Sequence, residues 1–325
     1  MSGELHVVLG PGGVGTALIE ALLAAEQPVR AASRTGAGHL PTEVEQVRAD
    51  ALDRDSVADA CRGASGIYSC LSAPYARWAE LFPPVWSNVA EVAVQQEAKL
   101  AQMDNVYMYG DAGPTLMTEE LPYAAKTEKG QLRARLAEQL EAESDAGRLR
   151  LAVGRAPDFF GPLGRTSALG DQVFTRLVTG KRPQLLGDPD LPHTYAYLPD
   201  IGAALATLGQ REEPLGRVWH LPCPETRTTS EIVELALAAA GSDARPQTAP
   251  RLLLRALGPD QRRHAGPDRD AVTVRAAVPV RRFQLPPHLR RRRNADRGRD
   301  RDHRRLVPAR RRPLTPRPPD RPRRS

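Results

Sequence analysis

A glycine-rich run near the start of the chain carries the clearest chemical signal in the sequence. The residues Gly10-Pro11-Gly12-Gly13-Val14-Gly15 have the spacing GxGxxG and stand between a Val-rich apolar run and a helical pattern. In that context Gly10 permits a tight turn, Gly12 lets a pyrophosphate approach the backbone, and Gly15 allows a helix to pack closely on a strand. The N–H groups at the helix start, including those of Gly13 and Val14, then face the phosphates. The run predicts a dinucleotide-binding loop, and the alternative is a glycine turn without a ligand.

The residues after the next apolar run indicate which dinucleotide the loop binds. A NAD site has an acidic residue about 20 residues beyond the glycines, where it accepts a hydrogen bond from the ribose 2′-OH. Ser33 and Arg34 stand there instead. A guanidinium group can bind a 2′-phosphate through two parallel hydrogen bonds. Ser33 and Arg34 therefore predict NADP as the preferred cofactor, with NAD as the second possibility; otherwise Arg34 is an ordinary solvated arginine.

Two further segments follow apolar runs that have the composition of strands. Asp50 could accept a hydrogen bond from the adenine amino group, or it could be the acidic residue at a helix start. Leu71, Ser72 and Ala73 end another apolar run. The carboxyl ends of parallel strands line the cofactor crevice in folds of this kind, so we expect these residues to contact the cofactor.

Alternating elements in residues 1–155 position these groups. The predicted strands are Leu5–Leu9, Val29–Ser33, Val44–Ala49, Ile67–Leu71, Val106–Tyr109 and Leu149–Val153. The predicted helices are Gly13–Ala25, Ser56–Cys61, a helix from Pro83-Pro84 to about Ala101, and Thr127–Asp145. This alternation predicts an α/β fold of Rossmann type, with a doubly wound parallel sheet and helices on both faces.

Residues 156–257 are less regular and richer in Pro and Gly. Helices are predicted at Ile201–Leu208 and Ser230–Ala240, and Thr228 and Glu231 have the spacing of a capping box. We expect a small substrate lobe together with the remaining elements of the sheet.

The order of these features resembles the short-chain dehydrogenase/reductase superfamily, and within it the extended or atypical members called the NAD-dependent epimerase/dehydratase family. The resemblance covers residues 4–257. It also rests on Tyr109-Gly110, Glu119–Pro122, Arg155–Pro162 and His193–Ile201. It implies a dinucleotide cofactor and a small substrate with a carbonyl or hydroxyl group.

The chain departs from the family at the catalytic positions. The family has a Tyr-x-x-x-Lys pair that exchanges a proton with the substrate, and a Ser or Thr after the fifth strand. The matching positions hold Lys129, Arg133 and Asn105. In one interpretation Lys129 is the proton donor, Arg133 favours its neutral form by like-charge repulsion, and Asn105 donates to the substrate oxygen. In the other, Lys129 and Arg133 are a basic surface pair and the chemistry uses another residue or is lost.

Three tyrosines could replace the missing acid: Tyr107, Tyr109 and Tyr123. Tyr107 and Tyr109 are expected on one face of a strand. His193 is expected to be scaffolding of the substrate lobe rather than a base. The predicted function is an NAD(P)-dependent oxidoreductase or epimerase/dehydratase-type enzyme, and the alternative is a catalytically inactive NAD(P)-binding sensor or regulator.

Charge is spread unevenly along the 325 residues. Residues 259–325 contain 22 Arg, 7 Asp, no Lys and no Glu, a net charge of +15, whereas the rest of the chain carries −8. We expect residues 258–325 to form a disordered basic tail, and their Arg, Pro, Ala, Gly and Asp are what a GC-rich gene gives when translated out of frame. A nucleic-acid role is disfavoured, because stacking aromatic residues and a recognisable reader module are missing from the tail.

Cysteine usage and hydropathy bound the remaining classes. Cys61, Cys70 and Cys223 are far apart, which disfavours disulfides and a structural zinc site, and no metal is expected. No apolar run approaches the roughly 20 residues of a membrane helix, and the first residues lack the pattern of a signal peptide. We expect a cytoplasmic monomer or homodimer whose partner is a small-molecule substrate.

Overall fold

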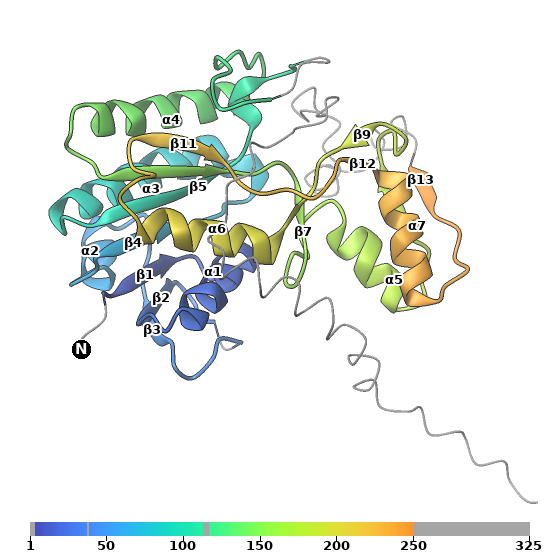
Figure 1. The fold of residues 1–325 in the computed structure, drawn as a ribbon, viewed down its shortest axis with the longest axis horizontal. Helices are drawn as coiled ribbons and strands as arrows, with labels where there is room; N and C mark the ends of the chain where they lie inside the picture. The colour runs from blue at the N-terminus through green and yellow to red at the C-terminus, as the bar shows by residue number, and fades with distance from the viewer. Residues whose placement is uncertain (1–3, 38, 113–116, 250–325) are drawn as a thin grey trace, which may run out of the picture. The chain divides into compact units, whose positions relative to one another are not determined.

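A seven-stranded parallel sheet forms the centre of the computed structural model, which describes residues 4–37, 39–112 and 117–249 (Figure 1). Its order is β11-β6-β5-β4-β1-β2-β3, and every neighbouring pair is parallel. The strands are β1 (His6–Leu9), β2 (Val29–Ser33), β3 (Glu45–Arg48), β4 (Gly66–Ser69), β5 (Lys99–Asp104), β6 (Leu151–Arg155) and β11 (Arg217–His220). The predicted doubly wound α/β fold of Rossmann type is confirmed.

Helices cover both faces of this sheet and bury two separate apolar clusters (Figure 1). One face carries α1 (Gly13–Ala24) and α6 (Leu198–Gln210), and the other carries α2 (Arg54–Ala60), α3 (Trp78–Gln95) and α4 (Glu128–Asp145). The backbones of α1 and α6 approach so closely that a Cβ at Gly202 would lie 2.3 Å from the Ala17 carbonyl carbon. A glycine is therefore required at this crossing.

The segment from α3 to β5 differs from the sequence-based expectation. Helix α3 begins at Trp78, so Pro83 and Pro84 lie inside it rather than at its start. Each proline lacks the N–H that would bond the carbonyl four residues earlier, but the apolar face of α3 is buried in the core and holds the helix together. The helix ends at Gln95 and does not reach Ala101.

The fifth strand lies earlier than predicted. It is β5, at Lys99–Asp104, and the predicted strand Val106–Tyr109 is instead a 3₁₀ turn, η2 (Tyr107–Tyr109). The sequence of this strand lacks an apolar pattern because three of its buried residues, Lys99, Gln102 and Asp104, are polar. Their burial places ionisable groups inside the sheet, next to the site described below.

After β6 the chain forms a smaller set of elements and returns to the sheet through α6 and β11. The smaller elements are the pairs β7 (Phe159–Phe160) with β10 (Ala196–Tyr197), β9 (Pro192–His193) with β12 (Arg227–Thr228) and β8 (Gln184–Leu186) with β13 (Gln247–Ala249), the π-helical turn η3 (Gly170–Thr175), α5 (Arg176–Val178) and α7 (Thr229–Ala240). The predicted capping box of Thr228 and Glu231 is confirmed at the start of α7. The predicted tail, residues 258–325, lies outside the described residues.

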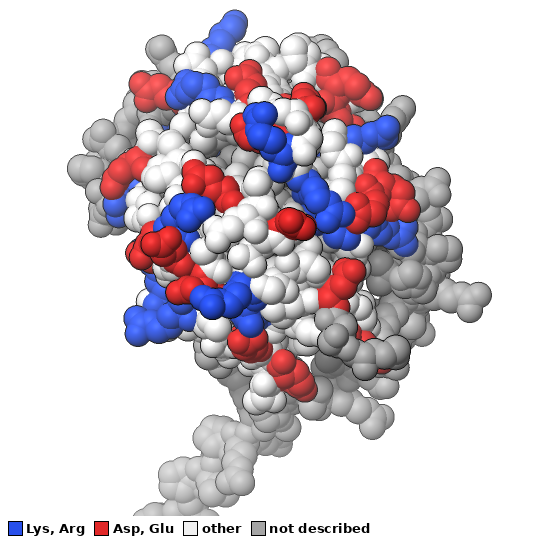
Figure 2. Space-filling model, turned by 90° about the vertical axis from the view of Figure 1, so that its left-hand side faces the viewer, with Lys and Arg blue, Asp and Glu red and all other residues white. Residues whose placement is uncertain are grey.

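The surface of the described residues mixes charges of both signs. On the face shown in Figure 2, Lys and Arg side chains are interspersed with Asp and Glu. Within the described ranges, none of the helices combines the length and the apolar character that crossing a membrane requires.

Candidate active site

The glycine loop connects β1 to α1, and the chain itself requires glycine at two of its three motif positions. Gly10 has φ +88°, in the left-handed region, and a Cβ there would lie 2.9 Å from the Cys70 carbonyl oxygen. A Cβ at Gly15 would lie 2.2 Å from the Gly10 carbonyl oxygen. At Gly12, by contrast, a Cβ would meet no described atom within 4 Å. The space beside Gly12 is therefore open on the side where a pyrophosphate would approach.

Helix α1 offers its first N–H groups to the same space. Gly12 is the N-cap residue with extended backbone, and no side chain caps the helix within the described residues. The Gly12 carbonyl accepts the first helical hydrogen bond, from Thr16 at 2.8 Å, so the N–H groups of Gly13 and Val14 precede the helical ladder. Such uncapped N–H groups and the positive end of the helix dipole favour a phosphate.

A pocket of about 240 Å³ lies at the ends of β2 and β3, where the adenosine half of a dinucleotide would lie. It is lined by Arg34, Arg48, Ala49, Asp50 and Ser56. Arg48 pairs with Ser33 across the two strands, and its Nε donates to the Arg34 carbonyl oxygen at 3.2 Å. Two guanidinium groups thus share one pocket. Arg48 was not predicted as a site residue, although the parallel register of the two strand ends places it beside Ser33.

Asp50 lines this pocket and does not begin a helix. Its Oδ1 accepts from the Leu52 N–H at 3.1 Å, which forms a local turn. The N-cap of α2 is Asp53, whose carboxylate accepts from the N–H groups of Asp55 and Ser56. The alternative that made Asp50 the acidic residue of the helix start is therefore wrong.

The segment Leu71, Ser72 and Ala73 follows β4 at the carboxyl edge of the sheet, beside the glycine loop. A Cβ at Gly10 would lie 3.2 Å from the Leu71 Cα, so the two segments are in contact. Ser72 is exposed, and the Ala73 carbonyl accepts from the Trp78 indole N–H at 3.1 Å. This hydrogen bond fixes the segment against the start of α3.

Arg133 is held in a buried ion pair at the start of α4. Its side chain is buried, and its Nη1 lies 3.1 Å from the Asp104 Oδ1. The guanidinium stacks on α3, 4.1 Å from the ring centre of Phe82 and 4.5 Å from that of Trp78. Asp104 pairs its charge, so a repulsion of Lys129 by Arg133 has little basis, and a surface pair of the two is excluded by the burial of Arg133.

Lys129 and Asn105 are linked at the edge of the sheet through two tyrosines that contact each other. The Lys129 ammonium is 4.3 Å from the ring centre of Tyr75, in the segment after β4. Asn105 follows β5, and its Oδ1 accepts from the Tyr107 N–H at 3.0 Å, which caps the η2 turn. Tyr75 and Tyr107 interact through their hydroxyl groups. Tyr75 was not predicted as a site residue, because no motif surrounds it.

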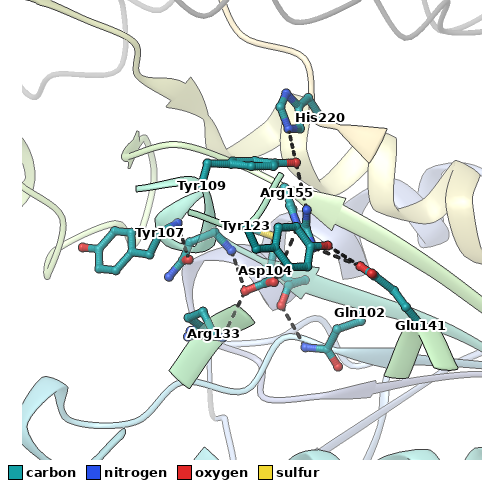
Figure 3. A network of polar contacts seen from close by, with 11 residues as sticks. Gln102, Asp104, Tyr107, Tyr109, Tyr123, Arg133, Glu141, Arg155 and His220 are labelled. Atoms are coloured by element: carbon teal, nitrogen blue, oxygen red, sulfur yellow. Dashed lines mark hydrogen bonds and ion pairs between the residues drawn. The ribbon is translucent and has the colours of Figure 1, made fainter. Parts of the chain in front are cut away.

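Tyr109 points away from this group and into a buried polar network (Figure 3). The expectation that Tyr107 and Tyr109 share a strand face is wrong, because residues two apart in a 3₁₀ turn point in different directions. The Tyr109 hydroxyl accepts from Arg155 Nη1 at 2.8 Å and lies 2.9 Å from His220 Nε2. Tyr109 is only 3% exposed, and burial raises the pKa of its phenol. Tyr109 is thus poorly placed to exchange a proton with a substrate.

Arg155, at the end of β6, is the centre of that network and is fully buried (Figure 3). Its guanidinium donates to the hydroxyls of Tyr109 and Tyr123 and to Glu141 Oε1, and its Nε lies 3.7 Å from Asp104 Oδ2. Burial lowers the pKa of His220, at the end of β11, to about 4. Three adjacent strand ends are therefore joined by one set of charged and polar side chains. Tyr123 belongs to this set, so it too is engaged in structure.

Comparison with known proteins identified one family. The sequence profile of the NAD dependent epimerase/dehydratase family matches residues 7–221. A search of curated protein sequences found no significant match.

Several solved structures share the fold. An epimerase of Methanothermobacter thermautotrophicus superposes with a TM-score of 0.71 at 15% identity, covering 86% of this chain and 84% of that one. A UDP-glucose 4-epimerase of Thermus thermophilus, solved with NAD, gives 0.66 at 18% identity, with 89% and 93% covered. A dTDP-glucose 4,6-dehydratase of Bacillus anthracis, also in complex with NAD, gives 0.66 at 17% identity, with 76% and 85% covered. At these identities the likeness establishes the fold.

Proposed function

Because the chain belongs to the NAD-dependent epimerase/dehydratase family, we propose that it is an NADP(H)-dependent oxidoreductase or epimerase/dehydratase-type enzyme that acts on a carbonyl or hydroxyl group of a small molecule. Family membership confirms the resemblance on which the predicted enzyme class rests. The observation that carries the cofactor preference is the pocket that Arg34 and Arg48 line at the end of β2 and β3.

The residues at the carboxyl edge fit a dinucleotide. The open space beside Gly12 and the uncapped start of α1 would hold the pyrophosphate. Arg34 and Arg48 would hold a 2′-phosphate, since two guanidinium groups match its charge and its oxygen geometry. The bound cofactor would supply or accept a hydride. Neighbouring structures solved with NAD support a cofactor of this class.

Lys129 and Asn105 are the groups we propose to bind the reacting oxygen of the substrate. Both lie at the edge where β5 and α4 meet, and Lys129 sits beside an aromatic ring in a half-buried position. An ammonium and an amide can each donate a hydrogen bond to a carbonyl oxygen. Arg133 is not included, because its guanidinium is committed to Asp104 and to the rings of α3.

A catalytically inactive NAD(P)-binding sensor is the second candidate. The burial of Arg133 and Tyr109 favours it, because both were candidates for the catalytic set and both are closed inside the protein. A sensor would retain the cofactor loop and lose proton transfer.

The deciding experiment measures binding and turnover separately. Fluorescence titration should show that NADPH binds more tightly than NADH. The absorbance of NADPH should then decrease with at least one member of a panel of aldehydes, ketones and sugar nucleotides. Tight NADPH binding without turnover across the panel would favour the sensor. If neither NADPH nor NADH binds, both proposals are refuted.

A further inference from the structure

A side-chain contact joins two segments that lie 35 residues apart at the carboxyl edge of the sheet. His193, on β9, has its Nε2 3.0 Å from the Oδ2 of Asp158, which follows β6. The backbone holds the same two segments together, because the Ala196 N–H donates to the Asp158 carbonyl at 2.8 Å. The parallel pairing of β10 with β7 begins at the next residue, where Ala196 faces Phe159. Backbone pairing directly after the two residues therefore holds their segments together.

The surroundings of His193 orient its ring. The ring centre lies 4.4 Å from that of Tyr195, whose hydroxyl is 2.9 Å from the Thr229 hydroxyl. The cation nearest along the paired strand is Arg227, opposite His193 on β12, and its guanidinium is paired with Glu225 at 3.2 Å. The His193 side chain is 14% exposed, so the ring is mostly enclosed but still reaches solvent.

Asp158 connects this pair to the residues proposed to bind the substrate. Burial raises the pKa of Tyr107, and the negative charge of Asp158 raises it further. Tyr107 interacts with Tyr75, over whose ring the Lys129 ammonium lies. The backbone also places Asp158 at this edge, because the N–H of Ala156, two residues earlier, donates to the Asp104 carbonyl at 3.1 Å, next to Asn105.

We infer that His193 is the acid–base group of this site and that Asp158 is its positioning residue. The inference rests on the proposed function. A carboxylate that accepts from Nε2–H holds the imidazole in one orientation and leaves Nδ1 to exchange the proton. From the sequence we expected His193 to be only scaffolding of the lobe, because Asp158 is distant in sequence and its contact with His193 could not be predicted.

The proton balance of a reduction follows from this arrangement. The carbonyl carbon gains the hydride that a reduced dinucleotide supplies, and the electron pair of the broken C=O π bond moves to oxygen. The oxygen takes the proton from Nδ1 of the imidazolium, which becomes neutral and keeps its Nε2–H toward Asp158. In the oxidative direction the neutral Nδ1 accepts the hydroxyl proton.

Substitution kinetics test the role of each partner with the full chain and the substrate found in the panel. His193→Gln should lower kcat about 10²–10⁴-fold and leave the NADPH Kd unchanged. Activity of His193→Ala should rise with added imidazole, which a structural role would not produce. Asp158→Asn should lower kcat without changing the KM of the substrate. The matched control is Asp171→Asn: its carboxylate pairs with Arg165 at 3.1 Å and is 42% exposed, against 46% for Asp158.

Nitrogen NMR of the imidazole gives a measurement that does not depend on activity. The neutral ring of His193 should carry its proton on Nε2 in the wild type, and Asp158→Asn should weaken that preference. A wild-type ring protonated on Nδ1, or full turnover by His193→Gln, overturns the acid–base assignment and leaves the proposed function intact. A wild type that binds NADPH and turns over no substrate instead overturns the proposed function, and the assignment fails with it.

Discussion

Two regions at the carboxyl edge of the sheet match the family pattern to different degrees. The cofactor end is the glycine loop between β1 and α1, and the catalytic end is the start of α4. At the cofactor end, Gly10 and Gly15 each meet a separate steric or backbone requirement, and the space beside Gly12 is open. At the catalytic end, Lys129 and Arg133 replace the tyrosine and lysine, and the second of these is buried against α3. Backbone requirements admit one residue type, so they persist. A proton donor can be replaced by another group that reaches the same oxygen.

At the catalytic end, the buried charge of Arg133 needs partners inside the protein. An arginine stays charged, and a buried charge is costly unless it is paired. Asp104 supplies the pair for Arg133, and the aromatic rings of α3 cover the flat faces of its guanidinium. The end proposed to bind phosphate is therefore made of backbone, whereas charged side chains form part of the core at the other end. Substitutions at the two ends should therefore have different effects.

The largest effect is expected at Arg155, the centre of the buried network. Arg155→Met leaves Asp104 and Glu141 without the cation that they share, so the free energy of unfolding should fall by about 3–5 kcal/mol. Urea unfolding followed by tryptophan fluorescence measures it. The exposed Arg62→Met is the control. An unchanged stability would show that the network is not a scaffold.

A second effect of the network should appear as pH dependence. Burial holds the pKa of folded His220 at about 4, whereas an unfolded histidine titrates near 6.5. The unfolded state therefore binds more protons, and the stability that His220 contributes is complete above about pH 6.5 and lost as the pH falls toward 4, a total of about 3 kcal/mol. Urea unfolding at a series of pH values should show this slope, and His220→Gln should reduce it. Burial also lowers the pKa of His6, so part of the slope should remain.

At the cofactor end, Gly12→Val should raise the NADPH Kd at least about 100-fold, which corresponds to roughly 2.7 kcal/mol. The branched side chain would fill the space that the pyrophosphate needs, while the absence of any described atom within 4 Å of a Cβ leaves the fold intact. Fluorescence titration measures binding and circular dichroism checks the fold. Gly12→Ala should have a smaller effect, and an unchanged affinity of the Val variant would remove the loop assignment.

Arg34→Asp should change the cofactor preference. Loss of a charge-assisted contact to the 2′-phosphate should cost NADPH about 1.5–3 kcal/mol, while NADH, which has a 2′-OH, keeps or gains affinity. Arg48→Gln should weaken NADPH binding in the same direction. The exposed Arg62→Gln should change neither affinity. A wild type that already prefers NADH would contradict the assignment of both arginines.

The smallest effect is expected for Lys129→Met. If Lys129 only donates a hydrogen bond to the substrate oxygen, kcat should fall about tenfold, or roughly 1.4 kcal/mol in the barrier, with no change in the NADPH Kd. A loss as large as that of His193→Gln would instead make Lys129 the proton donor. Steady-state kinetics of the two variants side by side distinguishes these outcomes.

The sequence predicted those parts of the fold that local patterns determine. β2 was predicted at its observed bounds, and the observed α1 and α4 differ from prediction by one residue at one end. β5 was missed because its buried polar residues are stabilised by partners that are distant in sequence, such as Arg133 and Arg155.

The same distinction applies to the site. The glycine loop could be predicted because its pattern lies within six consecutive residues. The direction of the Arg133 side chain depends on Asp104 and on the rings of α3, 29 or more residues away, and Asp158 meets His193 only through the pairing of β7 with β10. Such contacts have no local pattern.

The pairing of Arg133 with Asp104 limits what the family's tyrosine and lysine could restore if they were introduced at positions 129 and 133. Asp104, the last residue of β5, accepts hydrogen bonds from the Arg133 guanidinium and from the Asn105 N–H, so it holds the side chain at the position where the family has lysine. A lysine introduced by Arg133→Lys would meet this carboxylate before it could reach a cofactor. The double change Lys129→Tyr with Arg133→Lys therefore recovers the family's residues without recovering their geometry.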